Sequence, residues 1–171
     1  MTLPQQRHYQ VEIFTPHHML AGLVEPFGAL MIYLNHPERR TIQLKNATIT
    51  ALDAMSTVNP FTTDELWIPR QEVTMIRLVD PVSPDTMPLL PVKEKLRVFI
   101  PRLVVQAVFS RGQDTKMADI FSAYTGEWVP GIDAHLHSLL NTKAPIAPAA
   151  PALLLSKHYI QFYQPVPESA G

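Results

Sequence analysis

The chain contains the stretch VEIFTPHHMLAGLV at residues 11–24 and, 85 residues later, the stretch LRVFIPRLVVQAVF at residues 96–109. Each stretch has a phenylalanine, Phe14 or Phe99, followed two residues later by a proline. In the first stretch apolar residues alternate on either side of this proline break, a pattern typical of two strands joined by a tight turn. A matched pair of this kind indicates an internal repeat.

Two further blocks match in the same order, now with an offset of 87 residues. Residues 30–52 pair with residues 117–139, and residues 65–77 pair with residues 152–164. The alternative is that any two β-rich halves share alternating apolar positions. Alternation alone does not hold one register over three separate blocks, so a duplication is the better explanation.

Prolines separate the two predicted copies. The chain has 17 prolines and only 6 glycines, and the prolines cluster at residues 81–91 and 145–151. Because proline lacks an N–H donor, we expect these clusters to be connections and not central strands. The predicted organisation is a first unit at residues 8–80, a proline-rich linker at residues 81–94 and a second unit at residues 95–167.

Each unit is predicted to hold five short strands and one short helix. In the first unit we expect strands at 10–15 and 18–24, a helix at 29–35 with its counterpart at 117–124, and a closing hairpin of 66–69 with 73–78. Residues 41–44 and 47–52 are either one strand bent at Lys45-Asn46 or two short strands. Five strands in about 70 residues favour a small, strongly bent barrel, since an open sheet leaves edges unprotected. The predicted fold class is therefore mainly β, with two tandem small five-stranded barrels.

The order of these elements resembles the Sm/LSm-like barrels. Their first motif is similar to VEIF…AGLVE…TIQLKNATI, and their second to WIPRQEVTMIRL and LLSKHYIQFYQP. The chain is also similar to an uncharacterised bacterial family of Sm-like proteins with a short leucine-rich helix inserted in the barrel. The resemblance implies association through strand edges, hence a homo-oligomer, and we expect the segments 73–78 and 160–163 to supply those edges.

Two departures from the RNA-binding members of this family concern the nucleotide pocket. The Asp-x-x-x-Asn arrangement of their first motif is interrupted here by the inserted helix. Their Arg-Gly pair before the last strand is replaced by Pro69-Arg70 in the first copy and by Ser156-Lys157 in the second. The resemblance therefore does not by itself imply RNA binding.

A nucleic-acid site is one functional hypothesis. Arg70 and Lys157 occupy matching positions, and aromatic residues, Trp67 and Tyr159, lie close to them in the sequence. A cation beside an aromatic ring can hold a phosphate and stack on a base. The alternative is a pair of ordinary turns that carry cationic residues.

A metal site is a second hypothesis. Asp133, His135 and His137 alternate along a predicted strand and should project from one face. Two imidazoles and a carboxylate are suitable ligands for zinc or a similar ion. The alternative is the polar outer face of a half-buried strand, because a strand trio rarely supplies a complete tetrahedral site.

Other classes find less support. The formal net charge of −1 gives no global basic field for nucleic acid or an anionic membrane, and the absence of cysteine excludes disulfides and thiolate ligands. Residues 1–10 do not resemble a signal peptide, and no apolar run approaches the ~20 residues that span a bilayer. No nucleophile elbow, phosphate loop or acid–base pair is present. We expect a cytoplasmic protein that is not an enzyme and needs no cofactor. Its expected role is a structural or interaction module that forms homo-oligomers, with RNA or another protein as candidate partners. The alternatives are a module that binds RNA or single-stranded nucleic acid and a barrel that binds a small ligand or a metal.

Overall fold

The structure is a computed structural model that describes residues 5–83, 86–87 and 89–167. Strands account for 51% of it and helices for 9%, so the predicted mainly β class is confirmed. Among the described residues no helix is long and apolar enough to cross a bilayer. Pro84 and Pro88 of the predicted linker lie outside the described residues. The strands are β1 (Tyr9–Phe14), β2 (His18–Val24), β3 (Thr41–Ala51), β4 (Phe61–Pro69), β5 (Met75–Leu78), β6 (Val92–Ile100), β7 (Leu103–Arg111), β8 (Trp128–Ser138), β9 (Ala149–Ser156) and β10 (Phe162–Pro165).

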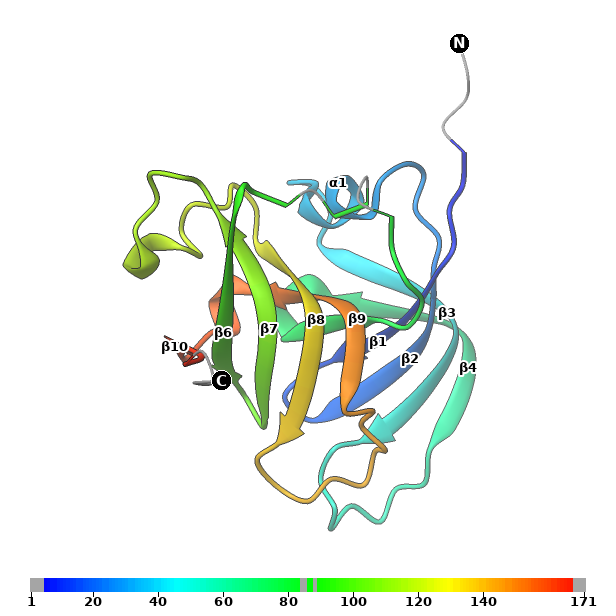
Figure 1. The fold of residues 1–171 in the computed structure, drawn as a ribbon. Coiled ribbons are helices and arrows are strands. Elements are labelled where there is room, and N and C mark those ends of the chain that lie inside the picture. The colour runs from blue at the N-terminus through cyan, green and yellow to red at the C-terminus, as the bar shows by residue number, and fades with distance from the viewer. Residues whose placement is uncertain (1–4, 84–85, 88, 168–171) are drawn as a thin grey trace.

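All ten strands belong to one antiparallel sheet, in the order β10-β6-β7-β8-β9-β5-β1-β2-β3-β4 (Figure 1). The first half of the chain (β1–β5) and the second half (β6–β10) each contribute five neighbouring strands. They meet where β5 pairs with β9, and this pairing is called the seam below. The sheet is therefore continuous and open, and β10 and β4 are its two edges.

Matching elements recur in the two halves at the spacing seen in the sequence. Strand β3 precedes β8 by 87 residues at both ends, and β5 precedes β10 by the same distance. A 3-10 helix follows β4 and another follows β9, again 87 residues apart: η1 (Arg70–Glu72) and η3 (Lys157–Tyr159). The register shift between β2 and β3 also has a counterpart between β7 and β8.

Strand β3 is a single strand that bends where the sequence predicts it. Asn46 has a φ of 49°, and Asp133 has a φ of 51° at the same place in β8. Asparagine and aspartate tolerate this left-handed region better than other residues with a side chain. In a regular strand, residues three apart point to opposite faces of the sheet. The bend shifts this alternation by one residue, so Leu44 and Ala47 are both buried.

The predicted closing hairpin is wrong. Strand β4 pairs only with β3, whereas β5 pairs with β1 on one side and with β9 on the other. The 3-10 turn η1 carries the chain from the edge of the sheet to its centre. All four residues of β5 are buried there, which explains why their apolar character does not mark an edge.

The prediction that residues 145–151 form only a connection is wrong at its end. Pro151 lies inside β9, a central strand. The ladder with β8 pairs Ala150 with Ala134 and then Ala152 with Ile132, so Pro151 falls opposite the bend at Asp133. A proline is tolerated there because no ladder hydrogen bond is needed from it.

The inserted helices differ between the halves. Helix α1 (Leu30–Asn35) buries Leu30 and Leu34 against the sheet, as expected. The counterpart predicted at 117–124 is only a 3-10 turn, η2 (Met117–Asp119), followed by irregular chain. The Asp119 carbonyl accepts hydrogen bonds from both the Ser122 hydroxyl and the Ala123 N–H, at 2.9 and 3.0 Å, which closes a single turn.

The two halves exchange core residues across the seam. The core of the second half contains four buried side chains from the first half: Phe14, Met19, Leu52 and Met75. The core of the first half in turn contains three buried side chains from the second half: Trp128, Ala152 and Leu154. Each half therefore completes the core of the other.

A buried charge also crosses the seam. Arg77 on β5 is only 8% exposed, and its guanidinium lies 2.8 Å from a Glu12 carboxylate oxygen and donates to the Ala149 carbonyl at 2.8 Å. A charge in this position is stable only when the strands are in the observed register, because removal of a partner leaves it buried and unpaired. Arg77 therefore fixes how β5 aligns with β9.

A glycine in β2 provides a test of the packing. A Cβ atom on Gly22 would lie 2.7 Å from the Lys45 carbonyl oxygen and 2.8 Å from Leu44 Cγ. We expect Gly22→Ala to lower the free energy of unfolding by about 1–3 kcal/mol, since the bend of β3 cannot move away freely. Urea denaturation measures this. The control is Gly112→Ala, whose nearest contact is the rotatable Thr115 hydroxyl at 3.0 Å, and a larger loss there would contradict the packing described.

Candidate functional site

Arg70 is engaged in contacts within the protein. Its guanidinium donates to the carbonyls of Leu34 and His36 at the end of α1, at 3.1 and 3.0 Å, and its Nε lies 2.9 Å from a Glu127 carboxylate oxygen. The Asn35 side-chain oxygen accepts a hydrogen bond from the Glu127 backbone N–H at 2.9 Å. Arg70 thus joins the helix of the first half to the second half.

Lys157 has a comparable role in the second half. Its ammonium group donates to the Tyr124 carbonyl, and partial burial lowers the pKa of this lysine. The Tyr159 hydroxyl donates to the Gln71 carbonyl at 2.8 Å, and burial, followed by the nearby Glu72 carboxylate, raises the pKa of Tyr159. Both predicted phosphate-binding cations are therefore occupied by backbone carbonyls.

The four residues predicted for nucleic acid do not form one basic surface. The hollow beside Tyr159 is lined by Gln71, His158, Glu127 and Glu72. Glu127 is paired with Arg70, and the Glu72 carboxylate repels phosphate. Trp67 lies on the edge strand β4 and is 57% exposed. These contacts favour the alternative of ordinary turns with cationic residues, so nucleic-acid binding stays a prediction that this geometry does not support.

The predicted metal ligands lie on one face of β8. Asp133, His135 and His137 are exposed, and the residues between them, Ala134 and Leu136, are buried, as the alternation predicts. Across residues 5–83, 86–87 and 89–167, no three His, Asp or Glu side chains are placed to hold a metal ion together. The exposure of these three residues fits the alternative explanation, the polar outer face of a half-buried strand.

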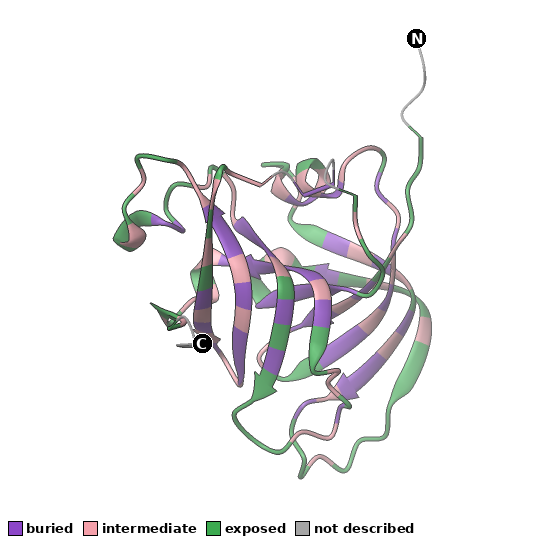
Figure 2. Ribbon diagram, in the orientation of Figure 1, coloured by how far each residue is buried: buried purple, intermediate pink, exposed green. Residues whose placement is uncertain are grey.

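The two edges of the sheet are far more exposed than their counterparts at the seam (Figure 2). In β5 every residue is buried, whereas β10, which follows it by 87 residues, has none that is buried. In β9 six of the eight residues are buried, whereas in β4 only Ile68 is. Each edge strand thus has the position of a seam strand without its partner.

An apolar groove of about 510 Å³ lies beside β4. Its apolar lining includes Leu66 and Ile68 of β4, Ile49 of β3 and Leu20 of β2. This groove is called the β4 groove below. No described residue of the chain fills it, although the equivalent space in the second half is filled by first-half side chains.

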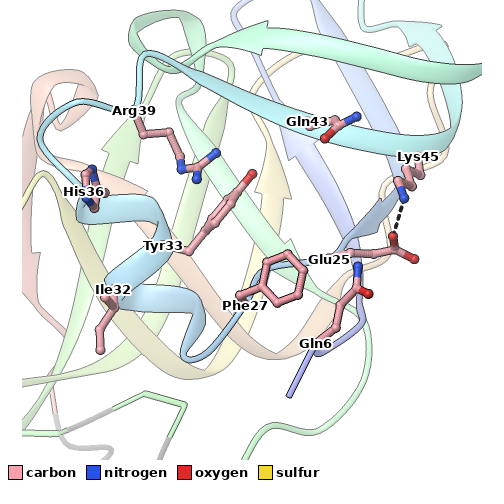
Figure 3. Close-up of a pocket in the computed structure, with 9 residues that line it drawn as sticks. All are labelled: Gln6, Glu25, Phe27, Ile32, Tyr33, His36, Arg39, Gln43 and Lys45. Atoms are coloured by element: carbon pink, nitrogen blue, oxygen red, sulfur yellow. Dashed lines mark ion pairs between the residues drawn. The ribbon is translucent and has the colours of Figure 1, made fainter. Parts of the chain in front are cut away.

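A second cavity, of about 400 Å³, has a mixed polar and aromatic lining (Figure 3). It lies between the end of β2, α1 and the first residues of β3, and it is called the α1 pocket below. It is lined by Gln6, Glu25, Phe27, Ile32, Tyr33, His36, Arg39, Gln43 and Lys45. No sequence pattern predicted it, because its residues come from four separate segments.

One carboxylate in the α1 pocket is already neutralised. Glu25 lies 2.7 Å from the Lys45 ammonium and 2.9 Å from His8 Nδ1. The hydrogen bond from Lys45 is the main reason that the pKa of Glu25 is held below its usual value, and the same contact raises the pKa of Lys45.

Comparison of the chain with protein-family models, with curated proteins and with solved structures gives no match. Functional inference therefore rests on the geometry described above.

Sequence reasoning missed the contrast between edge and seam. The signal that could have revealed it is a comparison of matched residues in the two halves. Apolar residues such as Phe162 and Leu139 match Met75 and Leu52 of the first copy, and both first-copy residues are buried in the second half. Alignment of the two halves identifies the matched residues, but it does not show which residue of each pair is buried.

The role of Arg70 is testable by substitution. We expect Arg70→Ala to lower the free energy of unfolding by about 1.5–3 kcal/mol, because the α1 carbonyls and Glu127 lose a charged donor. The control is Arg40→Ala, an exposed residue expected to change stability by less than about 0.5 kcal/mol. Urea denaturation compares them, and equal stability of the two variants would contradict the structural role.

The ion pair in the α1 pocket predicts a titration change. In Lys45→Gln the main cause of the lowered Glu25 pKa is removed, so this pKa should rise toward that of an ordinary glutamate. Carbon-detected NMR of the Glu25 carboxyl over a pH series measures it. The same titration of Lys93→Gln, at an exposed site on β6, should leave the Glu25 pKa unchanged.

Proposed function

We propose that this protein is a structural module that assembles with copies of itself head to tail, through the two edge strands β4 and β10. In this proposal the two halves are copies of one Sm-like barrel unit, and the seam within the chain is the template for the contact between chains. The observation that carries it is the pairing of β5 with β9.

The edge strands have the same sequence positions as the seam strands. Strand β10 follows β5 by 87 residues, and Leu66–Pro69 of β4 precedes Leu153–Ser156 of β9 by the same distance. The seam pairs Met75 with Leu155. The same register between two chains places Phe162 of one copy opposite Ile68 of the next.

Two exposed side chains of the second half, Phe162 on β10 and Leu139 directly after β8, match side chains that fill the second-half core. Leu139 is 53% exposed and corresponds to Leu52, which is 1% exposed; Phe162 is 58% exposed and corresponds to Met75, which is fully buried. Phe162 is also oriented, since its ring stacks on Phe99 at a centroid distance of 4.3 Å. The β10 edge thus presents preformed apolar side chains.

The β4 groove has the lining that would receive them. Its residues Leu20, Ile49, Leu66 and Ile68 correspond to Val105, Leu136, Leu153 and Leu155. Those four belong to the second-half core that already holds first-half side chains. Burial of one large apolar side chain stabilises a contact by about 1.5–3 kcal/mol, so two or three together can support association.

The contact is reciprocal. Trp67 on β4 corresponds to Leu154 on β9, and Leu154 is buried in the core of the first half. In the proposed assembly, Trp67 of one chain would therefore pack into the core of the next chain, as Leu154 packs into the first half within one chain. Tryptophan is among the residues that contribute most strongly to protein interfaces.

Two differences make the contact between chains weaker than the seam. Pro69 stands where Ser156 donates its N–H to the Thr74 carbonyl at 3.1 Å, so this hydrogen bond has no equivalent. Gln164 stands in place of Arg77, so the charged link to the neighbouring strand is also missing. A head-to-tail contact of this kind closes into a ring or continues as a filament, depending on the rotation between copies.

The test uses one disabled edge at a time. The wild-type chain should have a mass above the monomer mass of 19.2 kDa in sedimentation velocity. Trp67→Asp should disable the β4 edge and Phe162→Asp the β10 edge, and each should weaken association by at least about tenfold, the loss of roughly 1.4 kcal/mol. Mixing the two variants should restore a single contact and give a heterodimer.

The control is Ile32→Asp, which places the same charge at a residue that is 72% exposed on α1 and on neither edge. This variant should assemble like the wild type. A wild-type chain that stays monomeric at all concentrations would overturn the proposal, as would two edge variants that each assemble normally.

A further inference from the structure

The α1 pocket contains a cation without a carboxylate partner. The Arg39 guanidinium carbon lies 3.8 Å from the centroid of the Tyr33 ring, and Figure 3 shows the side chain pointing into the pocket. No Asp or Glu within the described part of the chain forms an ion pair with Arg39. Its buried Nε also has no hydrogen-bond partner among those residues. A guanidinium that lines a cavity without a carboxylate partner is suited to an anion.

The charges that line the pocket indicate how many negative charges a bound anion should carry. Glu25 is balanced by Lys45, and Arg39 then leaves an excess of one positive charge. A single carboxylate matches this excess, and its two oxygens match the planar fork of a guanidinium.

The rest of the lining is suited to an aromatic ring. Phe27, with 70% of its surface exposed, and the half-buried Tyr33 both line the pocket (Figure 3). Stacking on an aromatic side chain contributes about 0.5–1.5 kcal/mol beyond the area that it buries. The amide of Gln6, which is the bridge partner of Phe27, and the amide of Gln43 can pair with a polar substituent on such a ring.

The fold does not require this lining. The positions that match Tyr33, Arg39, Gln43 and Lys45 in the second half are Ile120, Gly126, Pro130 and Ile132. The second half has the same order of strands with none of these polar groups, so the scaffold forms without them. The polar and aromatic residues are a property of one half only.

We propose that the α1 pocket binds a small aromatic carboxylate. The carboxylate pairs with Arg39, the ring stacks on Phe27, and the glutamine amides contact a ring substituent. A volume of about 400 Å³ is within the range of sites that hold small molecules. None of the lining residues belongs to β4 or β10, although Gln43 and Lys45 pair with Trp67 and Glu65 of β4. The proposal of a ligand does not rest on the proposed assembly.

The test is a protein-observed NMR titration of the full chain with benzoate, 4-hydroxybenzoate and indole-3-acetate, each up to about 10 mM, a weak-binding limit. We expect saturable shifts of the Phe27, Tyr33 and Arg39 backbone amides with at least one of them. Arg39→Gln should weaken binding of that probe by about tenfold or more, as expected for loss of a charged pair. Phe27→Ala should weaken it by roughly three- to tenfold, as expected for loss of a stacking contact.

The control for charge is Arg40→Gln, an exposed neighbour that should bind the probe like the wild type. The control for the ligand is the amide of the same ring, which should bind at least about tenfold more weakly, since it lacks the charge. Thermal unfolding of each variant separates lost binding from lost folding. The proposal is overturned if none of the three acids saturates, if the neutral amide binds equally well, or if folded Arg39→Gln binds normally.

Discussion

The seam between β5 and β9 is the contact on which the rest of the structure depends. It joins two sets of five strands into one sheet, and it brings four side chains of the first half into the core of the second. Either half alone would present that apolar surface to water, and a domain of about 70 residues buries too little surface to bear such a loss easily. The seam therefore determines stability as well as shape.

Local pattern predicted the parts of the fold that depend on neighbours in the sequence. The limits of β2, the bend at Asn46 and the helix ending at Asn35 all follow from alternation, breaks and turn residues. The pairing of β5 did not follow, because its four buried residues show only that it is covered and not by which strand. Pro151 was misassigned for a related reason: a proline is excluded from a ladder only where that ladder needs a donor, and the bend at Asp133 removes the need.

The candidate sites show the same limit. Arg70 and Lys157 were correctly recognised as matching cations, but their carbonyl partners lie 33 to 36 residues away, beyond any local pattern. The α1 pocket collects Gln6 and Arg39 from segments with no shared motif. What the sequence does contain is a difference between matched positions of the two halves. Where the first half has Arg39 and the second half Gly126, the shared strand order does not require the arginine, so its presence needs a reason specific to the first half.

The seam also has a consequence for the growing chain on the ribosome. Strand β5 ends at Leu78, whereas its partner β9 begins at Ala149, so about seventy residues must be synthesised between them. At a synthesis rate of ~5–20 residues per second, the first half waits several seconds with Phe14 and Met75 uncovered. Its apolar face is then open to chaperones or to other nascent chains from the same message. The pairing of β9 with β5, late in synthesis, is thus the step that covers the apolar face of the first half.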